Sequence, residues 1–324
     1  MATRNVRTKR MQSRWLLIGQ RLWGRLVCTL DCNFVPIHAS STMQLTQAQL
    51  DEFDREGFLF FPSQFTPDEA RALQAAAQRV YDMHREEVWR ESNGAARTAF
   101  AAHKYEDTMA ALGAHPRLVN PVMQLVDGPV YMHQFKVNAK AAFDGDVWQW
   151  HQDYGTWRRD DDMPEPRAMN IAVFVDDVTA ANGPLIFLPR SHKVGVLEAG
   201  HDTATTSYPL WTLDRDTVTK LADEGGCVAP TGPAGSMLVF SSLLVHASPP
   251  NISPMSRTII YLSLCHVDNH IRQFKRPEFI AHRDFTPITP LADDCLAPFA
   301  ETADAAEQAH TETTTTKSAQ RNTP

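Results

Sequence analysis

The feature that most constrains the fold is a pair of metal-ligand residue types, His151 and Asp153, followed far along the chain by His246. Side chains two positions apart on an extended strand point to the same face, so this H-x-D pair can direct an imidazole and a carboxylate at one point. Two histidines and one carboxylate on one side of a metal, with open positions opposite, are typical of non-haem Fe(II) sites. The pattern therefore predicts a sheet that returns His246 to the pair.

Two observations separate this pair from the other H-x-D pairs of the chain, His266 with Asp268 and His282 with Asp284. The other pairs are followed by too little chain to return a third ligand. The second observation is Arg257, which follows His246 and begins an apolar segment. An arginine at the start of a buried strand costs stability unless it is paired, and its planar guanidinium suits a carboxylate. We therefore expect a carboxylate-binding site near the metal.

The segment 150–157, Trp-His-Gln-Asp-Tyr-Gly-Thr-Trp, resembles the phytanoyl-CoA dioxygenase family of Fe(II)/2-oxoglutarate oxygenases, and within it the ectoine hydroxylases. The likeness covers roughly residues 43–284 and includes Asn-Gly-Pro-Leu at 182–185 and His-Ala-Ser at 246–248. It implies Fe(II), 2-oxoglutarate and O2 as cofactor and co-substrates, and hydroxylation of an unactivated C–H bond of a small metabolite, with release of succinate and CO2. Related halogenases have a small residue in place of the carboxylate of Asp153, so its presence here implies hydroxylation.

The resemblance also implies roles for single residues. It makes His151, Asp153 and His246 the iron ligands, and it pairs Arg257 and Ser248 with the far carboxylate of 2-oxoglutarate. The predicted substrate pocket consists of Trp157, Phe240, Thr156 and Tyr261. Ile259 stands where ectoine hydroxylases have a substrate-binding asparagine, and losing a hydrogen-bonding group excludes a substrate strongly. We therefore expect another amino acid or carboxylate-bearing metabolite rather than ectoine itself.

Residues 130–141 alternate polar and apolar side chains, which predicts a strand with one polar face formed by Gln134, Lys136, Asn138 and Lys140. Alternation alone does not distinguish a solvent-exposed face from a ligand cavity. The resemblance favours the cavity for Gln134, which we expect in the active site beside the co-substrate.

The remaining pattern predicts an α+β protein built on a two-sheet β-sandwich or a jelly roll. With the resemblance, the expected fold is a double-stranded β-helix, a jelly roll of cupin-like form, with flanking N-terminal helices. Capping-box signals at Thr46 and Thr66 mark two helices at the front. Strands are expected at 168–175, 185–188, 236–240 and 257–264, separated by Gly-Pro turns. The acidic run at 158–166 is expected to be a solvated loop beside the metal, and a candidate lid.

Charge and composition divide the chain into three parts. Residues 1–42 hold seven Lys and Arg against one acid, which indicates either an organelle presequence or a mis-assigned start upstream of Met43. Residues 43–298 form the dioxygenase domain, and 299–324 have almost nothing apolar to bury, so a disordered tail is expected. The net charge of −7 argues against nucleic acid as a partner. No apolar run is long enough to cross a bilayer.

Five cysteines without a C-x-x-C pair indicate reduced thiols, and hence a cytoplasmic protein unless residues 1–42 direct import. The expected partner is a small-molecule substrate, and the chain is expected to be a monomer or homodimer. Two alternatives stay open at this point: a non-catalytic jelly-roll binding protein, and a cupin-like metalloenzyme that does not use 2-oxoglutarate. Neither explains Arg257 together with the three metal-ligand residues.

A chain that begins at Met43 is expected to fold and to consume 2-oxoglutarate at the rate of the full-length protein, because no pattern before Met43 belongs to the predicted core. Soluble expression and succinate release measure this. Loss of soluble protein on truncation would show that residues 1–42 are needed for folding of the domain.

Overall fold

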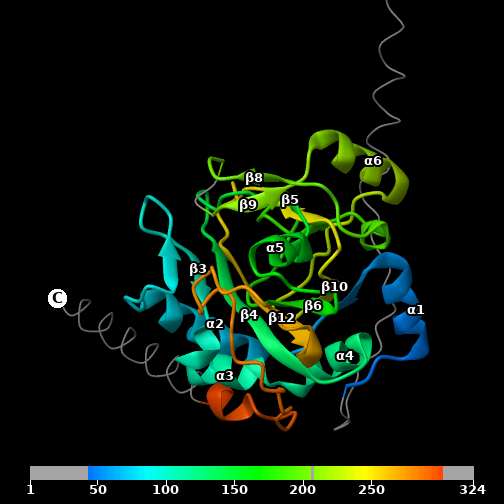
Figure 1. Ribbon diagram of the computed structural model, residues 1–324. Helices are drawn as coiled ribbons and strands as arrows, with labels where there is room; N and C mark the ends of the chain where they lie inside the picture. The colour runs from blue at the N-terminus through cyan, green and yellow to red at the C-terminus, as the bar shows by residue number, and fades with distance from the viewer. Residues whose placement is uncertain (1–42, 206–207, 302–324) are drawn as a thin grey trace, which may run out of the picture. The chain divides into compact units, whose positions relative to one another are not determined.

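The computed structural model describes residues 43–205 and 208–301, and within them it has an α+β architecture rich in sheet. A large sheet carries helices on one face and a smaller sheet on the other (Figure 1). The predicted extension at 1–42 lies outside the described residues. None of the helices in the described part combines the length and apolar character that a membrane span requires.

Two capped helices open the domain, as the sequence predicts. In α1 (Gln47–Glu56) and in α2 (Pro67–Asp82) the threonine before the helix and the residue at the third position form a complete capping box. Between them lies β1 (Phe58–Phe61). Gly57 ends α1 in the left-handed conformation, at φ 87°, and a Cβ there would stand 2.5 Å from the ring of His192. Glycine is therefore required at this position.

The other elements follow in chain order. They are β2 (Val88–Arg90), β3 (Ala96–Phe100), α3 (Asp107–Gly113), α4 (Pro116–Val126), β4 (Val130–Lys140), β5 (Trp148–His151), α5 (Asp153–Asp160), β6 (Ala168–Phe174), β7 (Ile186–Phe187), β8 (Gly200–Asp202), β9 (Leu210–Thr212), α6 (Arg215–Gly225), β10 (Met237–Ser241), β11 (His246–Ser248) and β12 (Arg257–His266). Short 3-10 turns stand at Ala102–Lys104, Ser191–Val194 and Val267–Asn269.

The large sheet has the strand order β1-β10-β6-β12-β4-β3-β2, and every pairing in it is antiparallel. Its central strands β6 and β12 are buried along their whole length. Both of their faces are covered, which explains why their sequences are almost continuously apolar.

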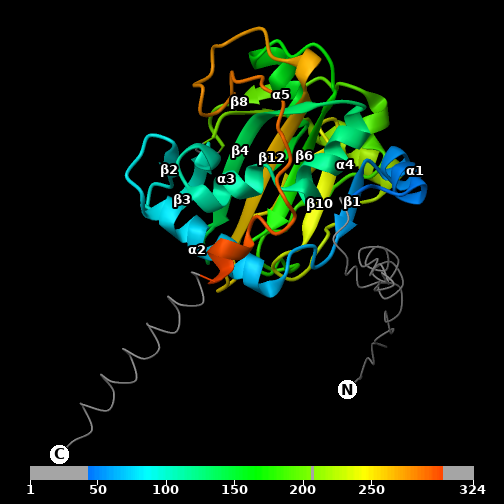
Figure 2. The same cartoon turned by 90° about the horizontal axis from the view of Figure 1, so that it is seen from below.

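The two faces of β12 belong to two different cores. Ile260 and Leu262 pack on the face covered by α2, α3 and α4, whereas Ile259 and Tyr261 point to the opposite face. Figure 2 shows the helices lying across the sheet. The alternation follows from the period of two of a β-strand.

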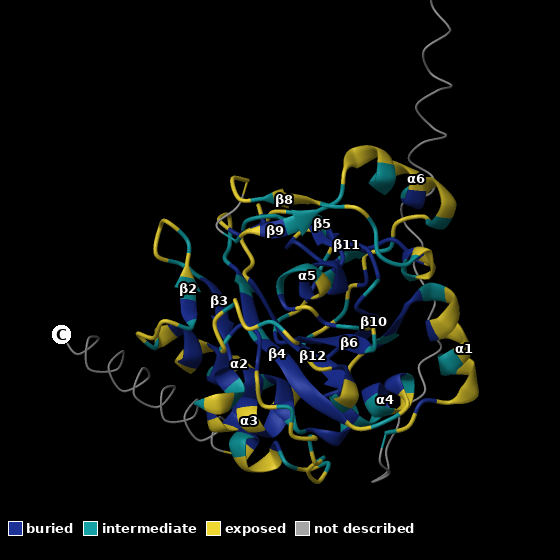
Figure 3. Ribbon diagram, in the orientation of Figure 1, coloured by how far each residue is buried: buried dark blue, intermediate teal, exposed yellow. Residues whose placement is uncertain are grey.

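On the second face lies the small sheet, in the order β5-β11-β7. Phe174 and Leu238 from the large sheet pack with Phe187 from the small one, in an apolar cluster that joins the two layers. In Figure 3 the strands of both sheets are mostly buried, while the outer surfaces of α1 and α6 are exposed. The third sheet is the hairpin β8-β9.

At the end of the described chain, residues 297–301 are helical, and Leu296 and Ala300 are buried. The packed domain thus continues slightly beyond the predicted boundary at 298, and the remainder of the predicted tail lies outside the described residues. The described cysteines, Cys227, Cys265 and Cys295, are free thiols.

Candidate active site

The three predicted metal ligands meet where β5 and β11 of the small sheet adjoin the start of α5. β5 and β11 pair antiparallel with His151 directly opposite His246, and the imidazole rings lie 4.2 Å apart. Asp153 joins them, and the potential ligand atoms of the three residues all lie within 4.8 Å of one another. Within the described residues, no other group of three or more His, Cys, Asp and Glu side chains meets this criterion.

The local backbone differs from the expected strand. β5 ends at His151, and Asp153 is the first residue of α5, with Gln152 as its N-cap. The prediction that the H-x-D pair lies on one extended strand was therefore wrong. The convergence arises because the chain turns into a helix between the two ligands.

Both histidines are oriented by their own backbone. Nδ1 of His151 lies 2.6 Å from the carbonyl oxygen of Gln149, and Nδ1 of His246 lies 2.9 Å from that of Leu244. A carbonyl oxygen only accepts, so each Nδ1 carries the proton and each Nε2 keeps its lone pair. Both Nε2 atoms face Asp153: that of His151 lies 3.7 Å from Oδ1, and that of His246 lies 3.5 Å from Oδ2.

Burial favours the ligand forms of the histidines. It lowers the pKa of His151 to about 3, with a further lowering by the neighbouring His246, and it also lowers the pKa of His246. For Asp153, burial raises the pKa, but the nearby His246, Lys136 and His151 outweigh it, so the net pKa is below the ordinary value. Two neutral imidazoles and one carboxylate are a donor set that fits Fe(II). The free Nε2 atoms of the two histidines lie close to each other and to the carboxylate of Asp153.

Asn170 on β6 is a site residue that the sequence reasoning missed. Its side-chain amide donates a 2.8 Å hydrogen bond to Oδ2 of Asp153 and accepts one of 2.7 Å from the hydroxyl of Ser263. A usable signal was present in the sequence: Asn170 is the one polar residue in an otherwise apolar predicted strand, and such a residue needs a partner.

Arg257 and Ser248, the predicted ligands of the co-substrate carboxylate, are in contact with each other. The Arg257 guanidinium donates to the Ser248 hydroxyl at 3.1 Å and to the carbonyl of Gly183. It is buried, no carboxylate of the described residues forms an ion pair with it, and its Nε has no hydrogen-bond partner. A buried guanidinium with a free N–H fits the carboxylate of a ligand.

Lys140 adds a second buried basic side chain beside Arg257, to which it is the register partner. Its terminal nitrogen donates to the carbonyl oxygens of Asp146, Ser248 and Pro249. Burial, with a further contribution from the charge of Arg257, lowers the pKa of Lys140 to about 6. The polar face of the 130–141 strand thus begins at this end of the site.

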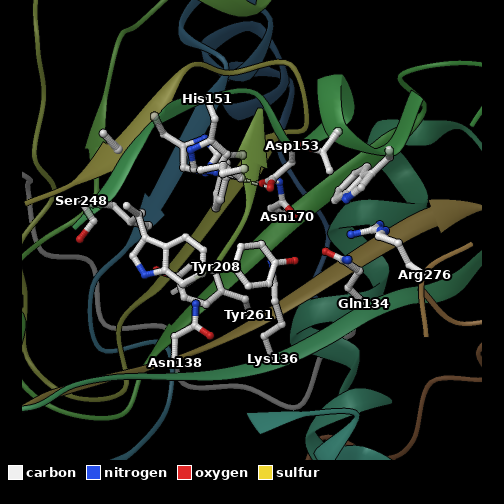
Figure 4. A pocket seen from close by; sticks show the side chains of 18 residues that line it. Gln134, Lys136, Asn138, His151, Asp153, Asn170, Tyr208, Ser248, Tyr261 and Arg276 are labelled. Atoms are coloured by element: carbon white, nitrogen blue, oxygen red, sulfur yellow. Dashed lines mark hydrogen bonds and ion pairs between the residues drawn. The ribbon is translucent and has the colours of Figure 1, made fainter. Parts of the chain in front are cut away.

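A pocket extends from the three ligand residues across the large sheet (Figure 4). Gln134, Lys136 and Asn138 line it, so the polar face of β4 looks into a cavity rather than into solvent. The predicted substrate residues Thr156, Trp157, Phe240 and Tyr261 line it too. Ile259 is not among the lining residues and packs in the apolar cluster between the sheets.

Two further lining residues, Arg276 and Tyr208, come from segments without a sequence motif. Arg276 forms an ion pair with Asp161, which is fully buried. The expectation of a solvated loop at 158–166 was therefore wrong for its first four residues, because 158–160 belong to α5 and the buried Asp161 anchors Arg276. Spacing gives no indication of this pair, since its members are brought together only by the fold.

Within the described residues, the other histidines take no part in the cluster. His192 contacts the backbone carbonyl of Asp54 at 3.0 Å, and His266 accepts from the backbone N–H of Asp268 at 3.1 Å.

Comparison with known proteins places the chain in a family. The family described as phytanoyl-CoA dioxygenase (PhyH) matches residues 53–259. The chain is 34% identical over 258 residues to L-proline trans-4-hydroxylase of Streptomyces griseoviridis, covering 75% of this chain and 95% of that protein. It is 30% identical over 256 residues to the ectoine dioxygenase of Stutzerimonas stutzeri (strain A1501), covering 74% and 85%.

Among solved structures, EctD from S. alaskensis with 2-oxoglutarate and 5-hydroxyectoine is similar, with a TM-score of 0.69 and 30% identity over 76% of this chain and 87% of that one. The chain therefore belongs to the phytanoyl-CoA dioxygenase family and is an iron- and 2-oxoglutarate-dependent dioxygenase of the hydroxylase type.

Proposed function

We propose that this enzyme hydroxylates a C–H bond of a small metabolite that carries a carboxylate, and that His151, Asp153 and His246 hold the iron. One observation carries the proposal: the three converging ligands line a pocket that contains Ser248, which contacts the buried Arg257, and also the basic side chains of Lys136 and Arg276. In Figure 4, Ser248 lies on one side of Asp153, while Arg276 and Gln134 lie on the other. The two ends suit two different anions.

The first end suits the co-substrate. Arg257 and Ser248 bind the far carboxylate of 2-oxoglutarate, and the unpartnered Nε of Arg257 supplies the missing N–H donor. Fe(II), when bound with 2-oxoglutarate and O2, supplies the oxidation that places a hydroxyl on carbon and yields succinate and CO2. The protein binds, orients and excludes water around that centre.

The second end suits a substrate anion. Lys136 lines the pocket, makes no hydrogen bond to another described residue, and is close enough to Asp153 to affect its pKa. Once Asp153 binds a metal cation, the ammonium of Lys136 lacks a dedicated counter-charge. Arg276 is already paired with Asp161. A substrate carboxylate at Lys136 would balance this charge, because a buried cation needs a partner.

The walls of the pocket limit the rest of the substrate. Trp157 and Phe240 are apolar, and the buried hydroxyl of Thr156 has no hydrogen-bond partner. A small ring or a short aliphatic chain with one polar group fits these surroundings. The relatives named for L-proline and for ectoine agree with a small substrate of this class.

The fold itself supports the proposal. We assign the two facing sheets to a double-stranded β-helix, because two of the three ligands lie on the small sheet and residues of both sheets line the pocket. A cytoplasmic location and a monomeric or dimeric state stay predictions from the sequence.

Two rival functions have less support. A non-catalytic binding protein has no use for three oriented ligands, and a cupin-like metalloenzyme that does not use 2-oxoglutarate gives Arg257 no partner. Anaerobic addition of Fe(II) and 2-oxoglutarate tests all three functions, because only the proposed one predicts a weak visible charge-transfer band together with succinate release in air.

The iron ligands are tested by substitution. Asp153→Ala is expected to abolish hydroxylation, and His151→Ala and His246→Ala are expected to lower iron occupancy as well, because each removes one of three donors. Bound iron and succinate release are the measurements. Wild-type turnover that depends on 2-oxoglutarate in all three variants would contradict the assignment.

The co-substrate end is tested by Arg257→Ala, which removes a charge-assisted contact. Affinity for 2-oxoglutarate is expected to fall by about 30- to 1000-fold, equivalent to roughly 2–4 kcal/mol, while iron still binds. Trp157→Phe is the matched comparison, because it alters the substrate wall only and should uncouple succinate formation from hydroxylation. Equal losses of 2-oxoglutarate affinity in the two variants would refute this division of roles.

The substrate end is tested by Lys136→Met. A screen of small amino acids and cyclic metabolites for stimulated succinate release first identifies a substrate. Its KM is expected to rise by about 10- to 100-fold in Lys136→Met, the worth of a hydrogen bond to a charged group, while Lys136→Arg retains binding and the KM for 2-oxoglutarate is unchanged. A best substrate without a carboxylate would refute the proposed class.

A further inference from the structure

The strand β6 contains one polar side chain in an otherwise apolar and fully buried run. That residue is Asn170, which is 2% exposed, and its register partner on β12, Ser263, is fully buried. Burying an amide and a hydroxyl in a sheet costs free energy unless both are hydrogen-bonded. Their position in the sheet therefore calls for an explanation beyond packing.

The two residues belong to one row that crosses four strands. Phe240 on β10 pairs with Asn170, Asn170 pairs with Ser263, and Ser263 pairs with Gln134 on β4. Residues directly opposite in a sheet share a face. Phe240, Asn170 and Gln134 accordingly all line the pocket, as do the proposed iron ligands. Asn170 connects the row to one of these ligands, Asp153, by a hydrogen bond.

The hydrogen bonds in this row have a fixed direction. The Ser263 hydroxyl donates to Oδ1 of Asn170, and the Asn170 amide donates from Nδ2 to Oδ2 of Asp153. An ionised carboxylate only accepts, so the NH2 group of Asn170 must face Asp153. Ser263 holds that orientation by binding the amide oxygen.

We propose that Asn170, oriented by Ser263, is a positioning residue that occupies one oxygen of Asp153, so that the carboxylate offers the metal a single oxygen. The inference rests on the proposed role of Asp153 as an iron ligand. A carboxylate held in this way fills one coordination position and leaves room for the co-substrates. A carboxylate free to rotate can present both oxygens and fill two.

Other buried asparagines of the chain show what a purely structural role looks like. The side-chain amide of Asn251 donates to the backbone carbonyls of Lys140, Ala141 and Met255, and that of Asn269 donates to the carbonyl of Glu165. Both fix loops. Asn170 instead bonds only side chains, one of them a proposed ligand.

The test compares Fe(II) binding by the full-length chain and three variants, measured anaerobically by competition with a chelator and without 2-oxoglutarate. Asn170→Ala is expected to weaken Fe(II) binding by about 10- to 100-fold, the usual effect of removing a partner of a metal ligand. Ser263→Ala keeps Asn170 but removes the hydrogen bond that orients its amide. It should weaken Fe(II) binding by about 2- to 10-fold, the usual contribution of one hydrogen bond. Asn269→Ala removes a buried asparagine that does not line the pocket and whose side chain binds Glu165 and Cys265, so it should not change the affinity.

A second readout follows the anaerobic Fe(II) and 2-oxoglutarate complex, whose visible band should weaken or shift in Asn170→Ala. Unchanged Fe(II) affinity and an unchanged band in both the Asn170 and Ser263 variants would overturn the inference. If Asn170→Ala does not fold, Ser263→Ala alone decides in the same way. Failure of the wild-type chain to bind Fe(II) would instead refute the proposed function, so the two failures are distinguishable.

Discussion

The pairing of β5 with β11 is the interaction on which the site depends, because it sets His151 opposite His246. Both strands are short, so their backbone hydrogen bonds alone could not hold the register. The rings of Phe187 and Phe240 pack against the imidazole of His246 and stabilise this register, with centroid distances of 6.2 and 5.2 Å. The apolar cluster between the two sheets thus positions the ligand side of the pocket.

The same burial determines the chemistry of the ligands. Desolvation lowers the pKa of both histidines, and backbone carbonyls fix the proton on Nδ1, so Nε2 is available without competition from a proton. Asp153 keeps its charge because cationic and imidazole groups surround it. A polar centre of this kind is stable inside an apolar layer only because its groups are paired with one another or with a ligand.

Under the proposed function, the distribution of charge separates the binding sites of the two organic anions. Arg257 is buried at the end where β12 begins and has Ser248 as its neighbour, whereas Lys136 lies further along β4, toward Gln134. In the register of β12 and β4, Arg257 is opposite Lys140 and Lys136 is opposite Tyr261, so the large sheet holds the two side chains at separate, fixed positions. Under the proposed function, specificity between co-substrate and substrate would follow from sheet geometry, because rigid strands do not let one basic side chain take the other's place.

The sequence by itself determined the residues of the metal centre, since His151, Asp153, His246 and Arg257 form a pattern whose chemistry has few other uses. It also determined the helix starts at Thr46 and Thr66 and the central strands, because caps and apolar runs are local signals. Only the tertiary structure decided that Asp153 begins a helix, that the polar face of β4 lines a cavity, and that Asp161 holds Arg276. These features depend on which segments pack together, and local sequence carries no record of a contact between residues far apart in the chain. Asn170 stands between the two cases: its burial could be predicted from its strand, but its partner Asp153 is known only from the fold.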